Sequence, residues 1–191
     1  MPRQPYLTGH YYHIYNRGAH RFPIFREPEN YRFVQGKLRR YSQEFALTLI
    51  SYCLMPNHYH FLVRQDGEHR AGLLPQRVFN SYSKAYNKRY DHCGTLFEGS
   101  YRVRHVRLLP DLLHMCRYIH GNPPKARLVR DAADWPFSNY LEWIGERDDI
   151  LVDREFIASH FSSPQAYRRF LLAYLERPRT RFPRHQPGCA V

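Results

Sequence analysis

The stretch ALTLISYCLMPNHYHFLV, residues 46–63, decides the fold of this chain. Residues 46–54 form a continuous apolar run, which is typical of a strand that is buried on both faces. Residues 58–63 alternate in character and predict a second strand. Between them lies Met-Pro-Asn, in which proline cannot donate to a strand ladder and asparagine tolerates left-handed backbone. The sequence therefore predicts a β-hairpin with its turn at residues 55–57.

The segments on both sides of this β-hairpin predict a mixed fold. Aromatic and β-branched side chains favour a strand at residues 11–16, and apolar side chains recur at helical spacing in residues 27–45. We expect a second helix at 73–90, one or two strands within 95–106 and a third helix at 111–121. This order, βαββαβ followed by a helix, predicts an α+β protein with a ferredoxin-like (RRM-like) antiparallel sheet.

The pattern changes after Asn139, and this change suggests a boundary in the chain. We expect one domain over residues 1–145 and a helical extension over residues 146–191. Within the extension, two short helices are expected at 156–161 and 164–176. Residues 177–191 are rich in proline and arginine and predict a mobile basic tail.

The composition favours a nucleic-acid partner. The 191 residues include 29 Lys plus Arg against 17 Asp plus Glu, for a net charge of +12, together with 16 tyrosines. Arginine pairs with phosphate and tyrosine stacks on unpaired bases, although a basic surface kept for solubility is the alternative. The apolar runs are too short for a membrane helix, and the first thirty residues carry arginines in place of a signal peptide. We therefore expect a cytoplasmic, nucleoid-associated protein.

Two pairs of residues are candidates for chemistry. On a strand, His58 and His60 project from the same face, and two imidazoles side by side are a good start for a divalent-metal site. On the third helix, Tyr118 and Asn122 are four residues apart and share a face. The alternatives are two ordinary surface histidines, a tyrosine in the core and an asparagine that caps the helix end.

Taken together, the segments PNHYH (residues 56–60) and RYIHGNP (117–123) resemble the REP-associated tyrosine transposases, which are single-tyrosine HUH (His–hydrophobe–His) transposases. Four further segments agree with the family in the same order: residues 12–18, 83–90, 94–101 and 135–140. The resemblance covers about residues 10–145. The chain departs from the family pattern at Ser100, where a basic residue is expected, and at Gly121 and Pro124 near the end of the third helix.

The resemblance implies a role for each candidate residue. His58 and His60 match the metal-binding histidines, Asn122 matches the third ligand, and Tyr118 matches the nucleophile. These ligands suit Mg²⁺ or Mn²⁺, with no cysteine to select zinc. The implied reaction is cleavage and strand transfer of single-stranded DNA at hairpin-forming repeats, through a covalent 5′-phosphotyrosine intermediate. His114 and His120 lie near Tyr118 in sequence, but neither is a compelling base, and we expect both to be packed or to face solvent.

The implied partner is single-stranded DNA that carries a hairpin with a single-stranded flank. The basic and amide side chains expected to contact it are Asn16, Arg17, Arg21, Arg102, Arg104, Lys125 and Arg127. Relatives occur as monomers and as helix-swapped dimers, so the sequence leaves both states open.

Two other function classes remain to be compared with this one. The first is a catalytically silent binder of structured single-stranded nucleic acid, which would have no need for His58, His60, Tyr118 and Asn122 together. The second is another HUH enzyme, such as a relaxase or a replication initiator. Those enzymes usually carry more metal histidines or paired tyrosines and lack the Asn-Pro pair found at residues 122–123.

Overall fold

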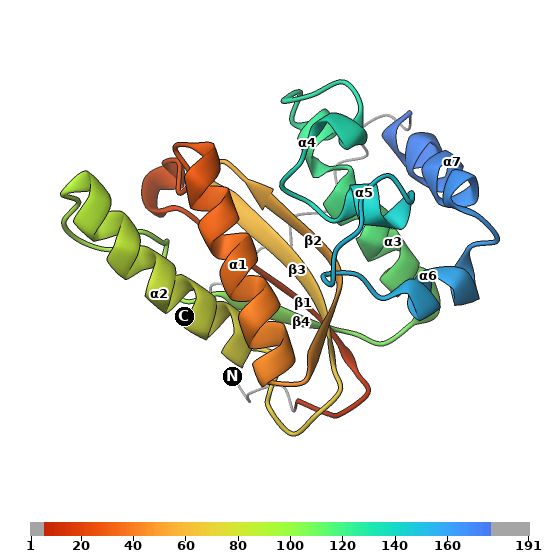
Figure 1. Ribbon diagram of the computed structural model, residues 1–191, viewed down its shortest axis with the longest axis horizontal. Coiled ribbons are helices and arrows are strands. Elements are labelled where there is room, and N and C mark those ends of the chain that lie inside the picture. Colours follow the sequence, from red (N-terminus) through yellow and green to blue (C-terminus); the bar gives the residue numbers. More distant parts are fainter. Residues whose placement is uncertain (1–5, 177–191) are drawn as a thin grey trace, which may run out of the picture.

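The computed structural model describes residues 6–176, and a four-stranded antiparallel sheet forms the centre of that part (Figure 1). Its strands are β1 (Tyr11–Arg17), β2 (Leu47–Met55), β3 (His58–Gln65) and β4 (Arg102–Val106), in the order β2-β3-β1-β4. This is the strand order of a ferredoxin-like sheet, and the predicted α+β class is confirmed.

The predicted β-hairpin is formed by β2 and β3. Met55 pairs with His58 and Cys53 pairs with His60 across the ladder, so the turn lies at Pro56 and Asn57. β2 is buried along almost its whole length, as its continuous apolar run predicted. Since successive side chains of β3 alternate between the two faces, Tyr59 and Phe61 point to one face and His58 and His60 to the other.

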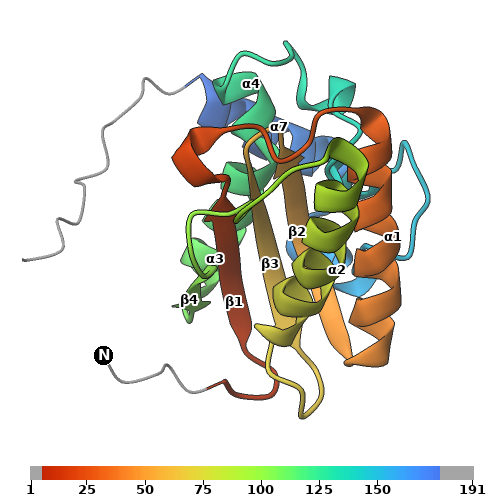
Figure 2. The ribbon, with the colours of Figure 1, turned by 90° about the vertical axis from the view of Figure 1, so that its left-hand side faces the viewer.

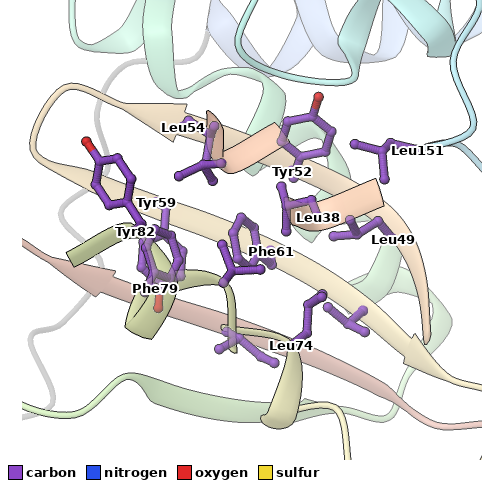
Figure 3. Packing of buried hydrophobic residues seen from close by; sticks show 14 of the residues in the cluster. Leu38, Leu49, Tyr52, Leu54, Tyr59, Phe61, Leu74, Phe79, Tyr82 and Leu151 are labelled. Atoms are coloured by element: carbon purple, nitrogen blue, oxygen red, sulfur yellow. The ribbon is translucent and has the colours of Figure 1, made fainter. Parts of the chain in front are cut away.

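One face of the sheet is covered by α1 (Pro28–Glu44) and α2 (Leu73–Tyr90), which pack side by side (Figure 2). The buried side chains between these helices and the sheet are aromatic and aliphatic. In Figure 3, Phe61 of β3 lies in the middle of this cluster, with Leu38 of α1 and Leu74 and Phe79 of α2 around it. Burial of this apolar surface is the main force that holds the two layers together.

The other face of the sheet is covered by helices from the second half of the chain, which gather on that side in Figure 1. They are α3 (Leu109–His120), α4 (Asn122–Lys125), α5 (Tyr140–Trp143), α6 (Arg154–His160) and α7 (Pro164–Leu175). α3 begins two residues before the predicted start, because Pro110 is tolerated in the first turn of a helix. Short 3₁₀ turns, η1 (Ala19–Arg21) and η2 (Ala132–Asp134), complete the described elements.

The helices after residue 139 share an apolar core with α3. The imidazole of His120 is fully buried there: its Nδ1 lies 2.6 Å from the Tyr167 hydroxyl and its Nε2 lies 2.9 Å from Oδ1 of Asn139. Asn139 in turn donates to the carbonyl oxygens of Ile50 and Leu151. α7 is thereby fixed to the helix that carries Tyr118. The predicted tail at residues 177–191 lies outside the described residues.

The stretch predicted to hold one or two strands contains one regular strand, β4. Before it, residues 94–101 run as a loop along the end of β1, where Phe97 makes a single bridge to Gly18. Gly94 and Gly99 have φ angles of 95° and 76°, which other residues rarely adopt, and such angles interrupt a strand. Within residues 6–176, no helix has the length and apolar character needed to cross a membrane.

Candidate active site

His58 and His60 lie side by side on the face of the sheet that α3 covers. Their ring centroids are 5.1 Å apart and their ring planes are nearly perpendicular. His60 is buried and His58 is half-buried, and this burial lowers the pKa of both imidazoles, that of His60 well below its ordinary value. Both side chains are therefore neutral at physiological pH, as a metal ligand requires.

α3 brings Tyr118 to the two histidines. Its ring centroid lies 5.4 Å from that of His60, in an edge-to-face arrangement. Burial raises the pKa of Tyr118, although a hydrogen bond from Asn122 opposes this effect. The phenol is therefore protonated at neutral pH and has to lose its proton if it acts as a nucleophile.

Asn122, at the end of α3, lies next to both Tyr118 and His58. Its Nδ2 donates a 2.7 Å hydrogen bond to the carbonyl oxygen of Tyr118, so the side chain caps α3 as one sequence reading suggested. The same side chain lies beside His58 and raises the pKa of that imidazole against the effect of burial. Asn122 therefore caps the helix and also lies against His58, and its role as a metal ligand stays a prediction.

Gly121 and Pro124, two departures from the family pattern, fit this helix end. A Cβ atom at Gly121 would lie 2.9 Å from the carbonyl oxygen of Arg117 and 3.1 Å from the ring of Tyr174 in α7. Glycine therefore allows α7 to approach the end of α3 closely. Pro124 lies in the first turn of α4, where the missing N–H of proline costs no helical hydrogen bond.

The hydrogen bonds of the histidines determine which ring nitrogens are available. Nδ1 of His58 lies 2.7 Å from Oδ1 of Asn57, and Nδ2 of Asn57 donates to the carbonyl oxygen of Arg21, which fixes the orientation of the amide. Since a carboxamide oxygen only accepts, His58 carries its proton on Nδ1 and keeps a lone pair on Nε2. Nδ1 of His60 is 3.0 Å from Nε2 of His13 in β1.

His13 was not among the predicted site residues. It is buried, and burial lowers its pKa to about 4, helped by the charge of Arg104. The pattern of β1 could have suggested it, because Tyr11, His13 and Tyr15 share the face opposite to Tyr12 and Ile14. The contact between His13 and His60 could not have been predicted without the sheet order, which places β1 beside β3.

The donor set fits a divalent cation such as Mn²⁺ or Mg²⁺. Nε2 of His58, a ring nitrogen of His60 and the carboxamide of Asn122 are three neutral donors, and they would leave positions for anionic and water oxygens. Within residues 6–176, no three His, Cys, Asp or Glu side chains gather into a metal site. A metal site on this face would therefore take its third protein ligand from a side chain outside that set, such as the carboxamide of Asn122.

A cavity of about 450 Å³ opens beside Tyr118, His58 and His60. Four of the seven predicted contact residues line it: Asn16, Arg17, Arg21 and Arg102. Arg104 lies on the same strand opposite His13, whereas Lys125 packs over the ring of Tyr174 and Arg127 is exposed. These last three residues do not line the cavity. Tyr15, which was not predicted, also lines it and offers an aromatic ring.

Glu98 lies in the same cavity and was not predicted. Oε1 of Glu98 is 2.9 Å from Nη2 of Arg17, and its second carboxylate oxygen also pairs with the guanidinium. Asn16 holds the adjoining loop by donating to the carbonyl oxygen of Gly99. An anion that binds Arg17 therefore has to compete with this carboxylate.

The two further histidines of α3, His114 and His120, are both bonded within the fold, as expected. Both nitrogens of His120 are used by Tyr167 and Asn139, and the ring of His114 contacts Arg117 and Tyr174. His120 is therefore unavailable as a proton acceptor for Tyr118.

Known proteins resemble this chain in fold and in sequence family. Among solved structures, the chain is similar to a REP-associated tyrosine transposase bound to a REP hairpin, with a TM-score of 0.65 and 16% identity over 80% of this chain and 93% of that one. A putative transposase from Deinococcus radiodurans R1 is similar with a TM-score of 0.44 and 17% identity over 63% of this chain and 97% of that one. No curated protein matches the sequence.

The family model described as "Transposase IS200 like" matches residues 6–122. The matched segment starts before β1 and ends at Asn122, so it includes His13, His58, His60 and Tyr118. This match and the shared fold confirm the resemblance found in the sequence: the chain belongs to the family of IS200-like transposases.

Proposed function

We propose that this transposase cleaves and rejoins single-stranded DNA with Tyr118 as the nucleophile. The observation that carries the proposal is the meeting of Tyr118, His58 and His60 at one cavity wall, with the Tyr118 ring 5.4 Å from that of His60 and with Asn122 beside Tyr118 and His58. A silent binder needs phosphate contacts and stacking surfaces, but it does not need a phenol beside two neutral imidazoles.

In the proposed reaction, Oη of Tyr118 attacks a backbone phosphorus atom. A bond forms between Oη of Tyr118 and phosphorus, which stays bonded to the 5′ oxygen of the downstream nucleotide. The bond from phosphorus to the 3′ oxygen breaks, and that oxygen takes up a proton, directly or through water, in place of the one that the phenol loses. The bond energy is kept in the phosphotyrosine, so a 3′-hydroxyl can later reverse the step without ATP. A divalent cation held by His58, His60 and Asn122 would polarise the phosphate that is attacked.

The remaining cavity residues position the DNA strand. Arg21 and Arg102 present guanidinium groups that can pair with phosphates next to the attacked one, and Arg17 can join them if it leaves Glu98. Arg21 is held by the turn at η1, where its carbonyl oxygen accepts from Asn57. The ring of Tyr15 is available to stack on an unpaired base.

The proposed substrate is a DNA hairpin with a single-stranded flank. The similar transposase structure is described as bound to a REP hairpin, and the net charge of +12 suits a polyanion. The Mg²⁺ or Mn²⁺ requirement follows from the donor set and is part of the proposal.

The experiment is cleavage of an end-labelled hairpin strand by the full chain, with and without EDTA. We expect cleavage that EDTA abolishes and Mn²⁺ restores. His58→Ala combined with His60→Ala should be inactive at every Mn²⁺ concentration while it still binds the hairpin. Full activity of this double variant would refute the assignment of the metal site. Binding without cleavage by the unmodified chain under all metal conditions would favour the silent binder.

A further inference from the structure

His13 lies behind the histidine pair, on the neighbouring strand. In the β1–β3 ladder, Tyr15 is opposite His60 and His13 is opposite Leu62, so the His13 ring reaches His60 diagonally. Its Nε2 is 3.0 Å from Nδ1 of His60, and the two rings stack with centroids 5.2 Å apart and an interplanar angle of 20°. Both side chains are 6% exposed, so water has little access to this contact.

We infer that His13 is a positioning residue, which accepts the Nδ1 proton of His60 and so keeps the lone pair of His60 on Nε2 for the metal. This inference rests on the proposed metal site. Two neutral imidazoles in this contact share one proton, and either ring can donate it. If His13 donated, the proton of His60 would lie on Nε2, and that nitrogen could not bind a cation. Only the arrangement with His60 as donor is compatible with the site.

The two metal-binding histidines are thus fixed in the same tautomer by different partners. His58 donates from Nδ1 to the carboxamide oxygen of Asn57, and His60 donates from Nδ1 to a neutral imidazole. Hydrogen bonds of this kind orient metal-binding histidines in other proteins, and their loss typically lowers metal affinity by about 10- to 100-fold. His13 itself is not a ligand in this arrangement. Its Nε2 already accepts the Nδ1 proton of His60, and Nδ1 lies on the side of the His60 ring away from the metal-binding Nε2.

The test compares two substitutions in the full chain without DNA. His13→Gln keeps an acceptor close to the position of Nε2, whereas His13→Phe keeps a stacked ring and removes the acceptor. Mn²⁺ affinity is measured from the electron paramagnetic resonance signal of the free ion. We expect His13→Phe to bind Mn²⁺ about 10- to 100-fold more weakly than the unmodified chain. His13→Gln should stay within about threefold, and both variants should bind the hairpin normally.

A second measurement covers the case in which His13→Phe does not fold. ¹⁵N NMR of the imidazoles in the metal-free chain reports directly which nitrogen of His60 carries the proton, with His60→Gln as the assignment control. A proton on Nδ1 supports the inference and a proton on Nε2 overturns it. Unchanged Mn²⁺ affinity in a folded His13→Phe, or equal loss in both variants, also overturns it. Failure of the unmodified chain to bind Mn²⁺ would instead count against the proposed metal site, and the NMR result would still decide the role of His13.

Discussion

Asn122 lies one helical turn after Tyr118, and its side-chain nitrogen donates a 2.7 Å hydrogen bond to the carbonyl oxygen of Tyr118. The position of the carboxamide is therefore coupled to the last turn of α3, the helix that carries the proposed nucleophile. Because the same side chain also lies beside His58, a shift of this helix end changes the relation of Tyr118 to the histidines.

Gly121→Ala should disturb this helix end without touching the DNA-binding side chains. The added methyl group would lie 2.9 Å from the Arg117 carbonyl oxygen and 3.1 Å from the Tyr174 ring, so either the turn or α7 has to move. We expect cleavage to slow by about tenfold or more, with hairpin affinity unchanged. Gly36→Ala is the matched control, since its Cβ meets no atom within 4 Å and alanine favours a helix. Equal cleavage by both variants would show that the helix end tolerates displacement.

Arg17 and Glu98 form an ion pair in the cavity, and we expect substitutions of the two residues to have opposite effects on DNA binding. Glu98→Gln removes a negative charge from the cavity and frees the Arg17 guanidinium, so hairpin binding should become tighter. Arg17→Ala should weaken binding and reduce the log–log salt slope by about one. Fluorescence anisotropy with a labelled hairpin at several salt concentrations measures both quantities. Arg127→Ala, outside the cavity, is the control. Weaker hairpin binding by Glu98→Gln would contradict the competition between Glu98 and DNA, and would mean that Glu98 holds Arg17 in the position that binds phosphate.

The buried His120 predicts a loss of stability in acid. Burial lowers its pKa to about 4 in the folded chain, whereas an unfolded histidine has a pKa of about 6.5. Between these values the unfolded chain binds a proton that the folded chain excludes. The contribution of His120 is therefore complete above pH 6.5 and is lost as the pH falls toward 4, by an amount on the order of 3 kcal/mol.

Urea unfolding from pH 7 to pH 4 measures this loss. His120→Gln should flatten the dependence of the unfolding free energy on pH, because the residue no longer titrates. Tyr167→Phe removes a partner of His120 but keeps the buried imidazole. Its unfolding free energy should therefore be lower at every pH, while the change of that free energy with pH stays the same. The same slope in all three proteins would assign the acid sensitivity to other groups.

Several parts of the fold and the site could be predicted because they depend on local sequence. The β2–β3 hairpin follows from an apolar run, a proline and an alternating run, and the H-x-H spacing alone places His58 and His60 on one face. Helix α2 has the predicted bounds, residues 73–90. Tyr118 and Asn122 needed the family resemblance in addition, because their helical spacing is equally compatible with a core tyrosine and a cap.

The features that were missed depend on contacts between distant segments. His13 reaches His60 only because β1 lies between β3 and β4. Glu98 faces Arg17 because left-handed glycines at 94 and 99 turn the loop along the end of β1, and no periodic pattern marks such a loop. Six of the seven predicted DNA contacts carry a positive charge, and charge does not distinguish Arg102 in the cavity from Arg127 outside it.

The central claim is that Tyr118 forms the covalent bond to DNA, and a labelled-strand gel tests it directly. The unmodified chain, Tyr118→Phe and Tyr15→Phe are incubated with a labelled hairpin and Mn²⁺ and then boiled in detergent. Tyr15 lines the same cavity, so its variant controls for the loss of a nearby hydroxyl. We expect a boiling-resistant protein–DNA adduct with the unmodified chain and with Tyr15→Phe. With Tyr118→Phe we expect no adduct and no cleavage, but normal hairpin binding. An adduct formed by Tyr118→Phe would contradict the account.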